Sequence, residues 1–261
     1  MAFVDIDGVK LETALLPGDA TKPWLVFLHE GLGSVSSWRA FPEKLARSLH
    51  CRALIYSRRG YGRSDALAAP RNVRYMHDEA LDVLPKLLAH YAIEKPILVG
   101  HSDGASIALI YAANHAANVT GAVLMAPHVL VEAVSQQSIA GITEVYERGE
   151  LRSKLARHHV HIEDAFLGWS RIWLDPRFRL WSLGAECQRL RTPALLIQGE
   201  DDAYGTLAQL DAIGEVAPGP VERLVLAKCG HTPHRDQEAA VLAAIIAFAG
   251  ELTPQSPRDQ T

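Results

Sequence analysis

Short apolar runs alternate along the chain with longer segments of helical periodicity. Eight runs, rich in Val, Leu, Ile and aromatic residues and bounded by turn residues, predict strands: Phe3–Ile6, Leu11–Leu16, Trp24–Leu28, Ala53–Ser57, Pro96–Gly100, Gly121–Ala126, Ala194–Gln198 and Glu222–Ala227. Helical patterns cover Ser37–Ser48, Met76–Tyr91, Ala105–His115 and Gln237–Gly250. The alternation predicts an α/β fold with a mostly parallel, eight-stranded sheet. The first two strands have no helix between them, so we expect an antiparallel hairpin around Asp7-Gly8.

One long segment, from Val131 to Arg191, interrupts this alternation. It contains no strand pattern but has helical patterns and three of the five tryptophans, Trp169, Trp173 and Trp181. About sixty residues between two strands are too many for a loop, so we expect a helical cap inserted after the sixth strand. This interpretation divides the chain into a core of residues 1–130 and 192–261 and a cap of residues 131–191.

Composition and charge exclude several classes of function. The 261 residues are 48% hydrophobic and 21% charged, which is typical of a globular protein. The formal net charge of −4 provides no basic surface for nucleic acid or an anionic membrane. The apolar run Val241–Ala249 is too short to span a bilayer. We therefore expect neither nucleic acid nor a membrane as a partner, and the oligomeric state stays open, with a homodimer among the states allowed.

The N-terminus and the cysteines point to the cytoplasm. Two early acids and the lack of a basic segment are unlike a secretory signal. Three cysteines, Cys51, Cys187 and Cys229, match neither a disulfide framework nor a zinc site. A cytoplasmic protein is the resulting expectation.

The clearest chemical signal is the stretch Gly100-His101-Ser102-Asp103-Gly104, which joins a strand pattern to a helical one. This is G-x-S-x-G in the context that the motif requires, a sharp strand-to-helix turn that exposes the serine hydroxyl. Ser102 is therefore the candidate nucleophile. Its partners should follow in the order acid, then histidine. Acidic residues end the strand Ala194–Gln198, and His231 follows the last strand.

With these pieces in order, the chain resembles the α/β-hydrolase superfamily over essentially its whole length. The resemblance rests on His29-Glu30-Gly31-Leu32-Gly33-Ser34, Arg59-Gly60-Tyr61-Gly62-Arg63-Ser64, Gly100 to Gly104, Gly199-Glu200-Asp201-Asp202 and Gly230-His231. It implies the α/β-hydrolase fold, with His231 as the base and Asp202 as the acid. Asp201 is the alternative acid.

The same comparison implies an oxyanion hole. One donor is the backbone N–H of Asp103, the residue after the nucleophile. The second is implied two residues past His29, at Gly31, with Leu32 as the alternative. This chain departs from the family pattern by carrying Glu30 where relatives have Gly and Ser57 where they have Asp. We interpret Glu30 as the partner of Arg59 across these two loops, against the alternative of a solvated acid.

Other histidines and the cap tryptophans are assigned lesser roles. His158-His159-Val160-His161 lacks an acid at helix spacing, so a solvated helix face is favoured over zinc. His101 should point away from the site, and His234 should face solvent or the start of a helix. No cofactor is implied. Trp169 and Trp173 share a helical face, and with Leu32 we assign them to the substrate pocket, although a purely structural role is the alternative.

These observations predict a cofactor-independent serine hydrolase of carboxylic esters or related small acyl compounds. Ser102 excludes the dehalogenase and epoxide hydrolase relatives, which carry Asp at this position. A carbon–carbon bond hydrolase of the meta-cleavage type is the first alternative, although such relatives have Asn before the nucleophile and an aromatic residue or Met after it. A lactonase or perhydrolase is the second. A ligand-binding receptor on the same fold is the alternative that is not an enzyme.

Overall fold

An eight-stranded sheet forms the centre of the structure, a computed structural model that describes residues 2–252. The strands are β1 (Ala2–Ile6), β2 (Val9–Leu16), β3 (Leu25–Leu28), β4 (Ala53–Tyr56), β5 (Ile97–His101), β6 (Gly121–Met125), β7 (Ala194–Gly199) and β8 (Val221–Leu226). Their order in the sheet is β1-β2-β4-β3-β5-β6-β7-β8. β2 runs antiparallel to both of its neighbours, β1 and β4, and all the other neighbouring strands are parallel. The predicted fold class is confirmed, and the predicted strand ends agree within two residues.

The apolar runs become central strands because helices cover both of their faces. Every residue of β3, β4, β5, β6 and β7 is buried, as expected for parallel strands between two helical layers. The predicted hairpin between β1 and β2 is also confirmed. Asp7 and Gly8 at its tip have φ values of 52° and 79°, the left-handed pair that a two-residue turn of this kind requires.

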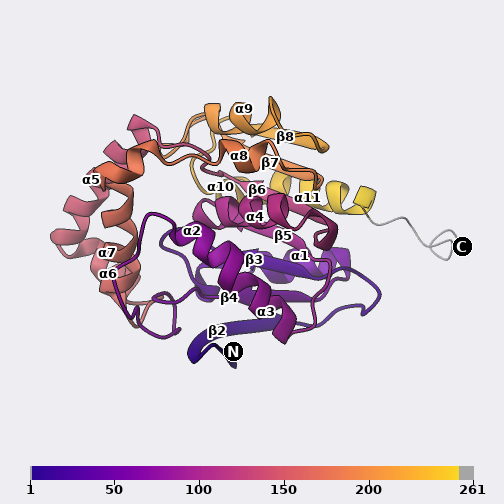
Figure 1. Ribbon diagram of the computed structural model, residues 1–261, viewed down its shortest axis with the longest axis horizontal. Helices are drawn as coiled ribbons and strands as arrows, with labels where there is room; N and C mark the ends of the chain where they lie inside the picture. Colours follow the sequence, from indigo (N-terminus) through magenta and orange to yellow (C-terminus); the bar gives the residue numbers. More distant parts are fainter. Residues whose placement is uncertain (1, 253–261) are drawn as a thin grey trace, which may run out of the picture.

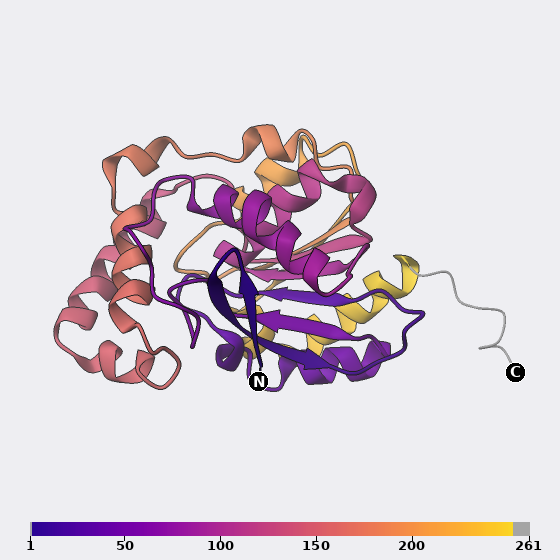
Figure 2. The ribbon, with the colours of Figure 1, turned by 60° about the horizontal axis from the view of Figure 1, so that its bottom comes forward.

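Two helical layers pack on the sheet (Figure 2). On one face lie α2 (Tyr75–Asp78), the π-helical turn η2 (Glu79–Val83), α3 (Leu84–His90), α4 (Asp103–Asn114) and α9 (Ala208–Gly214); on the other lie α1 (Phe41–Leu49) and α11 (Glu238–Leu252). Alternate strand residues divide accordingly, with Val26 and Leu98 in the first core and Phe27 and Val99 in the second. Three short elements complete the core: η1 (Val35–Trp38), η3 (Ala116–Asn118) and α10 (Pro233–Asp236).

Two predicted helices are less regular than their sequence patterns indicate. The pattern Ser37–Ser48 divides into η1 and α1, because Arg39 between them has a φ of 54° that no helix accommodates. The pattern Met76–Tyr91 contains η2 directly before Pro85. Proline cannot donate the i to i−4 hydrogen bond, and a π-helical turn is a common way for a helix to absorb such a local interruption.

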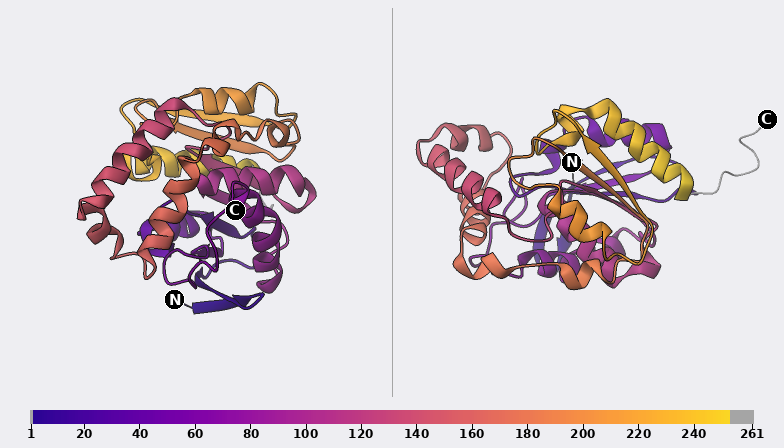
Figure 3. Two further views of the ribbon diagram at one scale, coloured as in Figure 1. Left: turned by 60° about the vertical axis from the view of Figure 1, so that its left-hand side comes forward. Right: turned by 90° about the horizontal axis from the view of Figure 1, so that it is seen from above.

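Between β6 and β7 the chain forms helices instead of strands. They are α5 (Ala133–Glu147), α6 (Glu150–Leu155), α7 (Ile162–Trp173), the 3-10 helix η4 (Pro176–Leu180) and α8 (Gly184–Cys187). In Figures 1 and 3, α5, α6 and α7 stand together at one side of the sheet. The arrows of the parallel strands point toward this side (Figure 2), so these helices face the edge where the strand-to-helix loops open.

Candidate active site

Ser102 occupies the sharp turn between β5 and α4. Its φ of 53° and ψ of −121° form a left-handed conformation that costs a non-glycine residue about 1–3 kcal/mol. The surrounding backbone leaves no room for side chains on either side of it. A Cβ atom on Gly100 would overlap the carbonyl oxygen of Gly104, and one on Gly104 would overlap the carbonyl oxygen of Leu28. The strained turn therefore holds the serine at the carboxyl end of β5.

Three side chains from separate loops form one hydrogen-bonded chain at this edge. His231 Nε2 lies 2.9 Å from Ser102 Oγ, and His231 Nδ1 lies 2.9 and 2.8 Å from the two carboxylate oxygens of Asp202. Ser102 follows β5, Asp202 follows β7 and His231 follows β8, so the sheet order brings the three loops together. The carboxylate accepts from Nδ1, which leaves Nε2 free to accept the serine hydroxyl proton.

Asp202 is enclosed by donors. Its Oδ1 accepts from the backbone N–H of Tyr204 at 2.7 Å, and its Oδ2 accepts from the Gln198 side-chain amide at 2.7 Å. Burial alone would raise the pKa of Asp202, but the hydrogen bond from His231 and the Tyr204 N–H hold it below the usual value. Asp201, in contrast, is exposed, and its backbone N–H donates to the carbonyl of Cys229.

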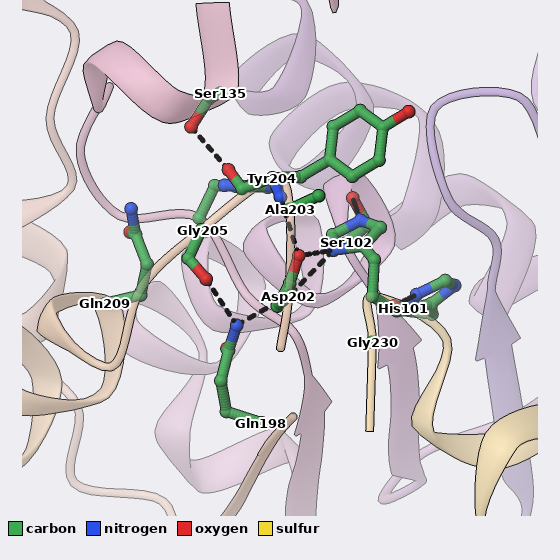
Figure 4. Close-up of polar contacts among 12 residues, drawn as sticks. His101, Ser102, Ser135, Gln198, Asp202, Ala203, Tyr204, Gly205, Gln209 and Gly230 are labelled. Atoms are coloured by element: carbon green, nitrogen blue, oxygen red, sulfur yellow. Dashed lines mark hydrogen bonds and ion pairs between the residues drawn. The ribbon is translucent and has the colours of Figure 1, made fainter. Parts of the chain in front are cut away.

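Gln198 and Ser135 support this acid and were not anticipated from the sequence. The Gln198 amide also donates to the Gly205 carbonyl at 3.0 Å, and the Ser135 hydroxyl of α5 donates to the Tyr204 carbonyl at 2.5 Å (Figure 4). Both bonds fix the loop that carries Asp202. The one available signal was a polar residue at the end of the buried run Ala194–Gly199, where Gln198 is 1% exposed.

In the part of the chain that the structure describes, backbone N–H groups without a hydrogen-bond acceptor occur in two segments that line the Ser102 cavity. Asp103 is the first residue of α4, and the N–H groups of a first helical turn have no acceptor within their helix. In the second segment, Gly31 and Leu32 follow β3. Within residues 2–252, neither of their N–H groups has a hydrogen-bond acceptor. All three residues line the cavity that contains Ser102.

Arg58, rather than Arg59, holds the loop that contains Gly31. The Arg58 guanidinium donates to the carbonyls of His29 and Glu30, and its backbone N–H donates to His29 Nε2 at 3.1 Å. Arg59 points elsewhere and donates to the Ala66 carbonyl. The proposed pair of Glu30 with Arg59 is therefore wrong. Consecutive side chains at the end of a strand point in opposite directions, and only Arg58 points into the core.

Glu30 instead faces His101, the residue before Ser102. Its Oε2 lies 3.5 Å from His101 Nδ1. His101 Nε2 in turn donates to the His231 carbonyl at 2.6 Å. His101 also lines the cavity, so the expectation that it points away from the site is wrong. Its contact with the His231 backbone gives it a place beside the hydrogen-bonded chain.

The side chain of Glu12 in β2 lies next to Ser57. Glu12 is 3% exposed, and its Oε2 accepts from the Ser57 hydroxyl at 2.7 Å and from the Arg63 N–H at 3.1 Å. Ser57 Oγ also accepts from the Val35 N–H at 2.9 Å. A carboxyl group of β2 thus holds Ser57 and the loop that follows β4.

A cavity of about 310 Å³ opens over Ser102. Its wall combines polar residues of the loops with apolar residues of the helices between β6 and β7: Glu30, Gly31, Leu32, His101, Ser102, Asp103, His128, Ile139, Ile142, Trp169, Trp173, Tyr204, His231, Thr232 and Arg235. Trp169 packs so closely on Gly31 that a Cβ there would overlap its indole ring. Trp181 is outside the cavity and stacks on Phe178, with ring centroids 5.0 Å apart.

The remaining histidines of interest have structural surroundings. His234 lies in the first turn of α10, is 2% exposed and packs against Trp38, so of its two expected positions the helix start is confirmed and the solvent-facing position is wrong. His158 bonds to the Ser36 hydroxyl, and His159 Nε2 donates to the Leu32 carbonyl at 3.0 Å. These two histidines join the loop before α7 to the loop after β3.

Two further searches covered the described part of the chain. In residues 2–252, no group of three or more His, Cys, Asp or Glu side chains is placed to hold a metal ion. No helix in this range has the length and apolar character needed to cross a bilayer.

A family model for the alpha/beta hydrolase fold matches residues 23–186. The chain therefore belongs to the α/β-hydrolase family. The mouse sn-1-specific diacylglycerol lipase ABHD11 is 30% identical over 108 residues, which cover 41% of this chain and 34% of the mouse protein. The 2-succinyl-6-hydroxy-2,4-cyclohexadiene-1-carboxylate synthase of Enterobacter sp. (strain 638) is 25% identical over 256 residues, 85% of this chain and 90% of that protein.

Solved structures share the fold at lower identity. MGS-M2, an α/β-hydrolase enzyme from a Medee basin deep-sea metagenome library, has a TM-score of 0.80 at 19% identity and covers 98% of this chain and 100% of its own. The enol-lactonase of Burkholderia xenovorans LB400 has a TM-score of 0.72 at 21% identity, and the match covers 95% of this chain and 99% of that one. The meta-cleavage product hydrolase of Pseudomonas fluorescens IP01 has a TM-score of 0.73 at 19% identity, and the match covers 97% of this chain and 98% of that one.

Proposed function

We propose that this chain is a cofactor-independent serine hydrolase of carboxylic esters or related acyl compounds. The observation that carries the proposal is the unbroken hydrogen-bonded chain from Asp202 through His231 to Ser102. A serine hydroxyl is a weak nucleophile until an adjacent base removes its proton, and the base needs an orienting acid. The strained turn at Ser102 and the pKa of Asp202 below its usual value support these roles.

In the proposed reaction, Ser102 Oγ attacks the substrate carbonyl carbon while its proton passes to His231 Nε2. Asp202 keeps His231 Nδ1 protonated and stabilises the imidazolium. The N–H groups of Gly31 and Asp103 donate to the oxyanion, and each such donor is worth a factor of about 10²–10³ in turnover. The imidazolium then protonates the leaving alcohol. A water molecule, deprotonated by His231, cleaves the acyl-enzyme to the free acid and restores Ser102.

We further propose that residues 131–191 act as a cap that selects the substrate. Support comes from the cavity wall, because Ile139, Ile142, Trp169 and Trp173 all belong to this segment. With Leu32, these side chains offer an apolar surface next to the polar loops. A cavity of about 310 Å³ fits a small acyl compound, near the lower end of ordinary ligand sites.

Carbon–carbon bond hydrolysis is the second candidate. The long segment between β6 and β7 and its tryptophans favour it, because a cap of this kind resembles that of the meta-cleavage hydrolases. His101 and Asp103 on either side of the nucleophile argue against it, since the meta-cleavage enzymes to which the chain is compared carry other residues there. A lactonase or perhydrolase would use the same acyl-enzyme, and a receptor would keep the fold without turnover.

A single panel of substrates tests the proposal. Purified protein is assayed with p-nitrophenyl esters of graded chain length, with lactones and with a vinylogous diketone. We expect turnover of the short esters, because the same serine chemistry applies to any activated acyl group that fits the cavity. Cleavage of the diketone alone would move the function to carbon–carbon hydrolysis. Binding without turnover of any compound would favour the receptor.

Substitution of the cap tryptophans should distinguish a role in the substrate pocket from a role in core packing. Trp169→Ala should change the ratio of kcat/KM between a long and a short ester, because binding energy remote from the reacting carbonyl selects the substrate. Trp173→Ala should do the same and also lower the melting temperature, because Trp173 is 1% exposed and its indole donates to Tyr75 at 3.1 Å. Cavities of this kind cost about 3–5 kcal/mol. Trp181→Ala is the matched control outside the cavity, and a ratio unaltered in both Trp169→Ala and Trp173→Ala would contradict the pocket assignment.

A further inference from the structure

His128 contributes an imidazole to the cavity that the proposed mechanism does not use. It follows β6 by three residues and is 3% exposed. Its ring packs edge-on against Trp173, with centroids 4.8 Å apart, and its centroid lies 5.6 Å from that of His231. The His128 ring is therefore within reach of a substrate bound at Ser102.

The backbone at His128 is fixed to the core of the fold. Its N–H donates to the Ser106 hydroxyl at 3.1 Å, and its carbonyl accepts from the same hydroxyl at 2.6 Å. The next N–H, of Val129, donates to the Gln209 side chain at 2.7 Å. A ring held in this way needs no rearrangement before it meets a ligand, which is the condition for a well-defined binding contact.

The ring itself has no hydrogen-bond partner among residues 2–252. Nδ1 is fully buried and unpaired. Nε2 also makes no bond to the described residues but is not enclosed, so it is the ring nitrogen that faces the cavity. Burial, reinforced by the neighbouring His231, lowers the pKa of His128 to about 3, so the imidazole is neutral and carries one proton. A buried N–H without a partner is rarer in folded proteins than a buried acceptor without one. The buried Nδ1 is therefore the nitrogen without a hydrogen, and the proton is on Nε2.

We propose that the Nε2–H of His128 binds a second, uncharged oxygen of the substrate, so that the preferred acyl groups carry a hydroxyl or keto oxygen next to the scissile carbonyl. This inference rests on the proposed hydrolase function and names its substrate class. The apolar wall of Ile139, Ile142 and Trp173 offers this oxygen no other donor. An anionic group at the same place is disfavoured, because the Asp202 carboxylate is bonded to His231 at 2.8 Å and the His231 ring lies 5.6 Å from that of His128.

The role is substrate binding rather than proton transfer. His128 has no hydrogen bond to Ser102, whose hydroxyl is already paired with His231. A neutral donor in the wall of the cavity instead discriminates between ligands. A site that holds an unpaired buried donor binds an analogue that lacks the matching oxygen less well.

The test compares p-nitrophenyl butanoate with its 2-hydroxy and 3-hydroxy derivatives, which differ from it by one oxygen. We expect the wild-type protein to favour at least one hydroxy ester in kcat/KM. His128→Phe, which keeps a flat ring but no donor, should lower that preference about tenfold, the size of one hydrogen bond between uncharged groups. His128→Gln, whose side-chain amide offers a donor near the position of Nε2, should restore part of it. His115→Phe is the matched control, since the His115 ring packs on Tyr111 at 4.6 Å and is outside the cavity.

Covalent titration of Ser102 with a fluorophosphonate counts the intact sites in each variant, so that a loss of folding is not read as a loss of preference. A wild-type protein without preference for either hydroxy ester would overturn the inference, whatever the fate of the variants. An unchanged preference in labelled His128→Phe would do the same and leave the hydrolase proposal standing. If the wild-type protein neither labels nor cleaves any ester, the hydrolase proposal itself fails.

Discussion

Replacing Ser102 with alanine should lower turnover of any ester substrate by a factor on the order of 10³ or more. The change removes the attacking oxygen and leaves His231 without its proton donor, so the members of the hydrogen-bonded chain fail together. The remaining rate would come from the backbone donors at Gly31 and Asp103 and from binding in the cavity. The fold should be preserved, because the strained turn depends on Gly100 and Gly104 rather than on the serine hydroxyl.

Labelling with a fluorophosphonate measures the same prediction without knowledge of the substrate. The wild-type protein should take up one label, on the peptide that contains Ser102, and Ser102→Ala should take up none. Ser153→Ala is a suitable control, since Ser153 is an exposed residue of α6 whose hydroxyl donates to the Gly149 carbonyl. A label on another serine, or wild-type turnover in Ser102→Ala, would contradict the assignment of the nucleophile.

The strands were predictable because their signal is local. A parallel strand covered on both faces must be apolar throughout, and the runs that became β3 to β7 satisfy this condition within four to six residues. The breaks inside the helical patterns were not predictable in the same way. Arg39 adopts a φ of 54° although nothing in its own side chain favours that conformation, so the surrounding packing decides it.

The turn at Ser102 was predictable for a similar reason. Its two flanking glycines are needed because of close contacts within the turn and with the neighbouring strand β3, and both are visible in a five-residue motif. The contacts that hold the loops around the site were not predictable from the sequence. Glu12 reaches Ser57 across 45 residues of sequence, and Arg58 reaches the carbonyls of His29 and Glu30 across 29 and 28 residues. Such contacts depend on which strands become neighbours, which no local pattern determines.

Two histidines lie deeper in the structure than their sequence context predicts. The position of His101 before the nucleophile predicts a side chain that points away from the site, and His234 is predicted to face solvent or the start of a helix. In the structure their rings lie 4.9 Å apart, and His234 packs on Trp38 and Phe41. An imidazole without charge can replace an apolar residue in a core, and burial lowers the pKa of His234 to about 2, which keeps it neutral.

Replacing Asp202 with asparagine should reduce turnover by about 10⁴-fold, because an amide no longer selects the tautomer of His231 in which Nε2 accepts the serine proton. The geometry adds a second reason. Both carboxylate oxygens are acceptors for three donors, from His231, Gln198 and Tyr204, and an amide NH₂ would face at least one of them.

Asp201→Asn is the matched control for this substitution, one residue away. Asp201 is exposed, and its side chain makes no hydrogen bond to residues 2–252, so turnover should change little. The lowered pKa of Asp202 means that its carboxylate stays ionised from neutral pH down through the usual pKa of an aspartate, and its contribution should be lost only as the pH falls below that value. Single-turnover rates for both variants at neutral pH provide the measurement. A larger loss in Asp201→Asn than in Asp202→Asn would transfer the role of the acid to Asp201 and require the loop after β7 to rearrange before catalysis.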